Sequence, residues 1–378
     1  MLHRLLVLLG SSVFLIGRLQ AGAVAPASEP AGPRVEVSGF EQRTIYHSPQ
    51  TPGYTAWCTL WLDPSGSLRL AFQQVTGPVA QPDKRANVTV LLTSKDNGKT
   101  WDKLREVPAR ADTHDDHGVY AAPGSSSFCG HGMAVLSNGT LVTGLWAGGD
   151  RKSGYVQRSA DGGKTWSAPI DLLDPAEYKT YPTQIRRLRD GRLMLVAGVV
   201  KQADVLTAKW LLKEFFQSDD GGSTWSHLWT MPPDVGLCEE SDLAELPGGD
   251  LLLIHRAEHY HDNHYLTSDR LQNVFHPAGK GWTIGPVSKA PFPHSGFPEL
   301  LKLREGIVLH VATDGIWWTA DSGAHWSRLN VPGSPYYPEA RQLSDGAILI
   351  VGHVGADNVY GSADQSIVQQ AFRLQVSR

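Results

Sequence analysis

Short apolar runs interrupted by turn residues recur along the whole chain. Each turn holds a glycine between two apolar or alternating runs, as in MAVLSNGTLVTGLW at residues 133–146. This pattern is typical of a β-hairpin. It occurs six times, around Gly66, Gly139, Gly191, Gly249, Gly306 and Gly346. The chain is therefore predicted to be all-β.

A second pattern, Ser-x-Asp-x-Gly-x-Thr-Trp, lies between the hairpins. It reads SKDNGKTW at 94–101, SADGGKTW at 159–166 and SDDGGSTW at 218–225, with a weaker copy, TADSGAHW, at 319–326. Each hairpin and the segment after it hold about four strands, as in one propeller blade. The sequence therefore predicts a six-bladed β-propeller over residues 37–378. The runs RVEVSGF (34–40) and SIVQQAFRL (366–374) are expected to share a blade and close the ring.

The residue types of this phrase indicate a structural role. Glycine allows a left-handed turn, and the Asp and Ser or Thr side chains form hydrogen bonds to backbone groups across it. The tryptophan supplies a large apolar surface for packing. We expect Asp96, Asp161, Asp220 and Asp321 to support the fold and to take no part in chemistry.

Composition narrows the class of protein. The 378 residues carry a net charge of −4, with 19% charged residues and no basic run, which argues against a nucleic-acid partner. The 39 glycines and 12 tryptophans fit a turn-rich β protein. No dinucleotide or phosphate-binding motif is present, so no cofactor is expected. We expect a monomer.

The N-terminus has the pattern of an export signal. His3 and Arg4 precede an apolar run at residues 5–16, and Ala23-Val24-Ala25 fits a cleavage site. The run is too short to span a bilayer. We therefore predict a signal peptide at 1–25, a linker at 26–36 and a secreted or periplasmic protein without a membrane span.

Cysteines and histidines give weaker signals. Cys58, Cys129 and Cys238 are an odd number, so at least one thiol is unpaired within the chain. We expect small buried residues, with one possible disulfide bridge left unassigned.

The stretches HDDH (114–117) and HRAEHYHDNH (255–264) lack the spacing of a tetrahedral metal site. They are interpreted as polar loops, and no bound metal is expected.

The repeated phrase resembles the Asp-box of the sialidase superfamily of six-bladed propellers, and the likeness covers essentially the whole chain after the signal. The segment EESDLAELPGGDLLLIHR at 239–256 resembles the sialidase segment that carries a catalytic Glu and, sixteen residues later, a substrate-binding Arg. These positions are Glu240 and Arg256 here. Sialidases place a nucleophilic Tyr nine residues before the last turn glycine, which is Tyr337 here. Glu240 likewise lies nine residues before its own turn glycine.

The resemblance also implies a general acid, Asp83, on a loop eleven residues before Ser94. Tyr336, Arg341 and His131 complete the expected substrate-binding residues with Arg256. His131 begins the inner strand of blade two and could also act as an acid or base near neutral pH.

The chain departs from the sialidase pattern in one respect. Sialidases begin blade one with Phe/Tyr-Arg-Ile-Pro, and that arginine is one of three that grip the substrate carboxylate. Here the stretch reads YTAWCTLWL, with Thr55, Ala56 and Trp57 at this place. Blade five also lacks an arginine at the matching place. Of the three arginines that bind the substrate carboxylate in sialidases, only the one matched by Arg256 is therefore clearly present here.

The resulting hypothesis is an exported, exo-acting glycoside hydrolase that removes a terminal acidic sugar with retained configuration. Glu240 would take the proton of Tyr337, whose neutral phenol approaches an anionic sugar without charge repulsion. One alternative is a lyase or atypical glycosidase acting on uronate-containing glycans, with His131 and Tyr337 transferring protons. Another is a non-catalytic glycan-binding propeller.

Overall fold

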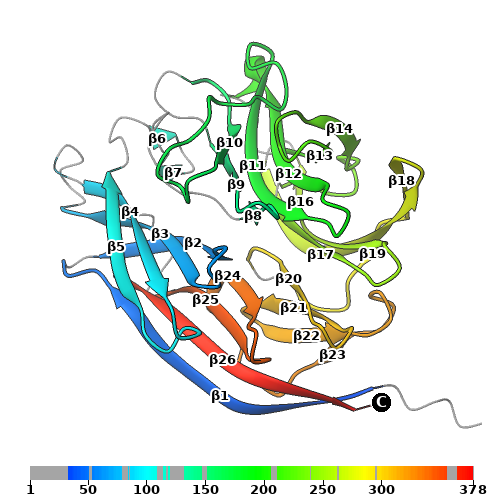
Figure 1. Ribbon diagram of the computed structural model, residues 1–378. Helices are drawn as coiled ribbons and strands as arrows, with labels where there is room; N and C mark the ends of the chain where they lie inside the picture. Colours follow the sequence, from blue (N-terminus) through cyan, green and yellow to red (C-terminus); the bar gives the residue numbers. More distant parts are fainter. Residues whose placement is uncertain are drawn as a thin grey trace, which may run out of the picture.

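The computed structural model describes residues 33–50, 53–78, 84, 86–108, 114–115, 118–119, 132–146, 151–205, 211–238, 240–261, 264–293, 296–355 and 364–377. Within these ranges the structure is almost entirely β, and its helical segments include the short 3-10 helix η2 (Gln202–Asp204). Six sheets surround a common centre, which confirms the predicted six-bladed β-propeller (Figure 1).

The first three blades follow the chain from its innermost strand outward. Blade one holds β2 (Tyr54–Leu62), β3 (Leu68–Thr76), β4 (Ala86–Ser94) and β5 (Asp102–Pro108). Blade two holds β8 (Met133–Val135), β9 (Leu141–Leu145) and β10 (Tyr155–Ser159). Blade three holds β11 (Tyr178–Arg187), β12 (Leu193–Lys201), β13 (Leu212–Ser218) and β14 (Ser226–Thr230). A short pair, β6 (His114–Asp115) and β7 (Gly118–Val119), precedes blade two.

The last three blades follow the same order, except that the two chain ends meet in blade six. Blade four holds β15 (Ser241–Glu245), β16 (Leu251–His261), β17 (His264–Ala278) and β18 (Gly281–Ile284), with β19 (Ser288–Lys289) beside β17. Blade five holds β20 (Glu299–Lys302), β21 (Val308–Ala312), β22 (Gly315–Thr319) and β23 (Ser327–Arg328). Blade six holds β24 (Tyr336–Gln342), β25 (Ile348–Gly355), β26 (Gln365–Ser377) and β1 (Arg34–His47).

The ring is closed by pairing of the first and last strands. β1 runs antiparallel to β26 from Arg34↔Ser377 to His47↔Ser366 and forms the outer edge of blade six (Figure 1). This is the closure that the sequence predicts. It joins the two ends of the chain, so the last blade is held by hydrogen bonds between segments that are far apart in sequence.

The predicted turns and the hydrophobic core follow the blade repeat. All six predicted turn glycines have φ between 80° and 95°, where side-chain-bearing residues are strained. Buried apolar clusters lie between neighbouring blades: Leu70 of blade one packs with Leu349 of blade six, and Leu253 of blade four packs with Met194 of blade three. Core packing thus joins each blade to its neighbours.

The Asp-containing phrase forms a hydrogen-bonded turn in each copy. In blade two, Asp161 accepts the Thr165 hydroxyl at 2.6 Å and the Ser159 hydroxyl at 2.8 Å. Its counterpart in blade one, Asp96, has a pKa lowered to about 2 by hydrogen bonds from Thr100. The tryptophan that ends the phrase packs against the preceding blade, as where Trp101 donates to Gln369 of blade six at 2.8 Å.

The six inner strands contact one another in sequence around the ring: β2, β8, β11, β15, β20, β24 and β2 again. The ends at which these strands begin therefore lie close together at one end of the propeller, here called the top face. Residues that occupy the same place in different blades are brought together there.

Candidate active site

The predicted nucleophile and base meet at the top face. Tyr337 lies near the start of β24, and Glu240 directly precedes β15. The Tyr337 hydroxyl donates a hydrogen bond of 2.5 Å to Glu240 Oε1. The two residues are 97 positions apart in the chain, so this contact exists because blades four and six place equivalent positions at one centre.

Arg256 holds the other oxygen of the same carboxylate. It lies on β16, and its Nη1 donates to Glu240 Oε2 at 2.9 Å while its backbone N–H donates to the Glu240 carbonyl at 3.0 Å. Its Nη2 donates to Glu258 Oε1 at 2.5 Å, and Tyr260 donates to Glu258 Oε2 at 2.6 Å. Arg256 thus bridges two carboxylates and fixes the orientation of Glu240.

The electrostatics keep the Tyr337 proton on its phenol at rest. Burial, and then the negative charge of Glu240, raise the pKa of Tyr337 well above its ordinary value. Burial acts against the charge on Arg256, but the negative charge of Glu240 and the effects of further nearby groups together outweigh it and raise the pKa of Arg256. A hydroxyl held against a carboxylate that is fixed by a guanidinium is suited to proton transfer during a reaction.

Aromatic rings hold Tyr337 in place. Its ring is stacked on His353 with centroids 6.0 Å apart and lies 4.7 Å from the ring of Tyr336 and 6.1 Å from that of Phe297. Tyr337 has φ +49°, beside a β-bulge between Tyr336 and Glu339. The bulge turns the side chain away from the regular pleat, as bulges near functional sites do.

The structure brings together four of the seven predicted site residues: Tyr337, Glu240, Arg256 and Tyr336. Asp83 and His131 lie outside the described residues. Arg341 is placed elsewhere, because its guanidinium lies 3.1 Å from the Glu339 carboxylate and 3.5 Å from that of Glu299. Its side chain belongs to a second, deeper set of charges, and a role for Arg341 in binding substrate stays a prediction.

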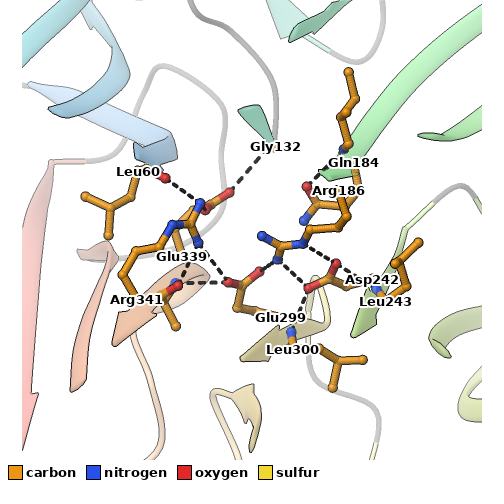
Figure 2. A network of polar contacts seen from close by, with 12 residues as sticks. Leu60, Gly132, Gln184, Arg186, Asp242, Leu243, Glu299, Leu300, Glu339 and Arg341 are labelled. Carbon is orange, nitrogen blue, oxygen red and sulfur yellow. Dashed lines mark hydrogen bonds and ion pairs between the residues drawn. The ribbon is translucent and has the colours of Figure 1, made fainter. Parts of the chain in front are cut away.

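That set, here called the axial network, joins the inner strands around the centre (Figure 2). Arg186 of blade three donates to Asp242 and to Glu299, each at 2.6 Å. In blade six, Arg341 contacts Glu339, and Glu339 accepts the backbone N–H of Gly132 from blade two at 3.3 Å. Arg341 also donates to the Leu60 carbonyl of blade one, so all six blades contribute a group.

The axial network contains three carboxylates and two guanidiniums. Asp242, Glu299 and Glu339 are at most 1% exposed. Burial raises the pKa of Glu299 well above its ordinary value, and that of Glu339 is also raised. One proton shared among the carboxylates would balance the charges. Sequence reasoning missed this set, although its three acids all lie seven residues before a turn glycine.

Other predictions concern cysteines, metals and membranes. Cys58 and Cys238 are both buried, whereas Cys129 lies outside the described residues. The described ranges contain no group of three or more His, Cys, Asp or Glu side chains that could hold a metal ion. They also contain no helix that is long and apolar enough to cross a membrane.

Solved structures with the same architecture include glycoside hydrolases. A protein of unknown function from Dyadobacter fermentans is 17% identical with a TM-score of 0.63, covering 90% of this chain and 99% of its own. An α-L-arabinanase from Penicillium chrysogenum, complexed with arabinobiose, is 14% identical with a TM-score of 0.61, covering 87% and 97%. The NanB sialidase from Streptococcus pneumoniae is 13% identical with a TM-score of 0.59, covering 88% and 70%.

At these identities the likeness is one of fold: the chain is a six-bladed propeller of the architecture that sialidases and arabinanases share. No protein-family model matches the chain, and no curated protein matches it in sequence. A closer assignment depends on the chemistry of the site.

Proposed function

We propose that this protein is a retaining, exo-acting glycoside hydrolase with Tyr337 as nucleophile and Glu240 as its base. The observation that carries the proposal is the 2.5 Å hydrogen bond from the Tyr337 hydroxyl to Glu240 Oε1. A phenol is a weak nucleophile while it keeps its proton, and a carboxylate at this distance removes that proton as attack proceeds.

The first step forms a covalent intermediate. The Tyr337 oxygen bonds to the anomeric carbon, its proton passes to Glu240, and the bond from the anomeric carbon to the departing oxygen breaks. The departing oxygen needs a proton from an acid, and we propose Asp83 for that role on the basis of its place in the sequence. Water then attacks the anomeric carbon from the vacated side and gives a proton to the Asp83 carboxylate. The bond from that carbon to the Tyr337 oxygen breaks, and Glu240 returns the proton to this oxygen. The two inversions give retained configuration.

Arg256 supports this chemistry by positioning Glu240. Its hydrogen bond to Glu240 Oε2 leaves Oε1 directed at the phenol. A charge-assisted pair of this kind restricts the carboxylate to one orientation and favours its ionised form. The fold likeness to an arabinanase and a sialidase is consistent with a glycosidase.

We also propose that the protein acts outside the cytoplasm, since residues 1–25 have the pattern of an export signal. N-terminal sequencing of the secreted protein should then begin at residue 26. A mature protein that still carries the apolar run at 5–16 would contradict export with cleavage.

Product stereochemistry tests the proposed mechanism. The protein is incubated with a panel of oligosaccharides and aryl glycosides that carry neutral or acidic terminal sugars, and the first product is followed by proton NMR. We expect one terminal sugar to be released in the configuration it had in the substrate. Release of the opposite anomer, or of an unsaturated sugar, would contradict the retaining mechanism. Binding without any release would favour a non-catalytic glycan-binding propeller.

A further inference from the structure

The hydrogen bonds of the Tyr337–Glu240 pair continue along β16 beyond Arg256. Arg256 Nη1 donates to Glu240 Oε2 at 2.9 Å, and its Nη2 donates to Glu258 Oε1 at 2.5 Å. The Tyr260 hydroxyl then donates to Glu258 Oε2 at 2.6 Å. The result is a chain of phenol, carboxylate, guanidinium, carboxylate and phenol that is centred on Arg256.

The backbone holds the two carboxylates beside the guanidinium. Leu237 and Glu258 exchange both of their backbone hydrogen bonds, at 2.8 and 3.0 Å. The Arg256 N–H donates to the Glu240 carbonyl at 3.0 Å, so the segment before β15 is tied to β16 at two places. The side chains of Glu240, Arg256 and Glu258 are 8%, 20% and 14% exposed. Glu258 is therefore a fixed part of the site and not a surface residue with many conformations.

Glu258 affects Glu240 through the guanidinium that both carboxylates share. A guanidinium that gives both of its arms to one carboxylate strongly favours the ionised form of that carboxylate and makes it a weak base. Here one arm is directed to Glu258. The negative charge of Glu258 also acts on Glu240 as a like charge, which favours the form that carries a proton. Both effects make Glu240 a stronger base than a carboxylate that holds Arg256 alone.

Other ionisable groups from several strands also act on Glu240 or on Arg256. Those in the described ranges include Tyr336 and Tyr337 of β24, Arg270 of β17, Lys213 of β13, Tyr260 of β16 and Cys238 before β15. Burial lowers the pKa of Arg270 to about 10, and the negative charge of Glu240 acts in the opposite direction. All these groups stay in place when Glu258 is changed, so a substitution there isolates the effect of Glu258.

We propose that Glu258 is a positioning residue that acts through Arg256 and keeps Glu240 basic enough to take the proton of Tyr337. The proposal rests on the proposed function and adds a residue to the same site. In the first step the Tyr337 proton moves to Glu240 Oε1, while Glu258 stays ionised and keeps its bond to Arg256. In the second step that proton returns to the Tyr337 oxygen. Glu258 thus acts on the strength of the base and not on the reacting atoms.

Glu258→Gln tests the proposal, because the amide keeps the size of the side chain and an oxygen for Arg256 but removes the charge. The titration of Glu240 is followed by ¹³C NMR of protein labelled at the glutamate carboxyl carbon, with Glu240→Gln identifying the signal. We expect the pH at which half of Glu240 is protonated to fall by about one unit in Glu258→Gln, the size of one nearby charge. The acidic limb of the kcat/KM profile should move in the same direction.

Two further variants complete the series, and melting curves verify that each variant is folded. Glu258→Asp draws the carboxylate back by one methylene and should lower the Glu240 midpoint by a smaller amount. It keeps the test informative if Glu258→Gln does not fold. The control is Glu245→Gln, which removes a carboxylate that is paired with Arg189 at the other end of β15. It should leave the Glu240 midpoint unchanged.

The direction of the shift decides the outcome. If Glu258 only supported the fold around Arg256, its loss would loosen the pair of Arg256 with Glu240 and raise the midpoint. An unchanged or higher midpoint in Glu258→Gln would therefore overturn the proposal. If Tyr337→Phe is inactive in that case, the proposed function stands and only the role of Glu258 is wrong. If Tyr337→Phe keeps its activity, the proposed function itself fails.

Discussion

Two sets of polar side chains draw on the same inner strands of this propeller, at positions two residues apart in the chain. In blade four, Glu240 belongs to the site at the top face and Asp242 to the axial network. In blade six, Tyr337 belongs to the first and Glu339 to the second. The upper set contains a phenol, whereas the lower set joins three buried carboxylates to two guanidiniums (Figure 2).

The difference between the two sets shows which features distinguish a catalytic site from a supporting network in a propeller of repeated blades. Arginine–carboxylate pairs occur in both sets, so such a pair alone does not distinguish catalysis from support. The upper set adds an ionisable hydroxyl and a strained backbone at Tyr337. The lower set adds contacts from every blade, and therefore serves to hold the ring together.

The largest effect is expected from Tyr337→Phe. This change removes the nucleophile and its hydrogen bond to Glu240 but keeps the aromatic packing against His353 and Phe297. We expect kcat to fall by on the order of 10⁴-fold, as when other covalent nucleophiles are removed. Steady-state kinetics on the best substrate of the panel measures the loss. A variant that retains more than about a tenth of the activity would exclude Tyr337 as nucleophile.

The next effect concerns stability rather than activity. Arg186→Met removes the guanidinium that pairs with Asp242 and Glu299, leaving two buried carboxylates without it. The free energy of unfolding should fall by about 3–5 kcal/mol, as when one partner of a buried pair is lost. Denaturant unfolding measures it. Arg189→Met is the matched control: its pair with Glu245 is more exposed, and its loss should cost less than about 1 kcal/mol. Equal losses would contradict a supporting role for the network.

A smaller effect is expected from Arg256→Lys. A single ammonium cannot bridge Glu240 and Glu258 as the planar guanidinium does. We expect kcat/KM to fall roughly tenfold, which corresponds to the loss of one charge-assisted hydrogen bond. Kinetics of Arg256→Lys beside Arg189→Lys provides the measurement. Unchanged kinetics in both variants would mean that Arg256 does not position Glu240.

The smallest effect is a pH dependence of stability that arises from the lower set. The pKa of Glu299 is raised above its ordinary value of 4.5, so its protonated form is favoured in the folded state. Its contribution to stability is full below pH 4.5 and is lost as the pH rises through the folded-state pKa. Acidification toward pH 4.5 should therefore raise the contribution of the axial network to the free energy of unfolding, which denaturant unfolding at several pH values measures. Glu299→Gln should remove this part of the stability profile; an unaltered profile would argue against the assigned proton.

The repeat explains why much of the fold follows from the sequence. Turn glycines such as Gly249 fix the hairpins, and counting nine residues back from them finds Glu240 and Tyr337. The same count finds Trp57. Its left-handed backbone conformation, with φ +54°, could not be predicted from the sequence. Blade periodicity thus predicts which positions meet, because equivalent places on the inner strands converge at one end.

What could not be predicted is the direction and partner of each charged side chain. Arg341 follows Tyr337 by four residues, and chain order alone does not show that its guanidinium turns to Glu299 and Glu339. Glu258 occurs in a stretch rich in histidine, where nothing identifies it as a partner of Arg256. The contact from Arg341 to Glu299 joins two blades, and it depends on the depth at which each side chain lies.

The central claim is that Tyr337 forms a bond to sugar, and covalent trapping tests it most directly. A slowly reacting fluorinated glycoside of the preferred sugar is incubated with the protein, and the digested product is mapped by mass spectrometry. The account predicts one added sugar on the peptide that contains Tyr337, and none in Tyr337→Phe. A sugar bound to Glu240 or to another residue would contradict it.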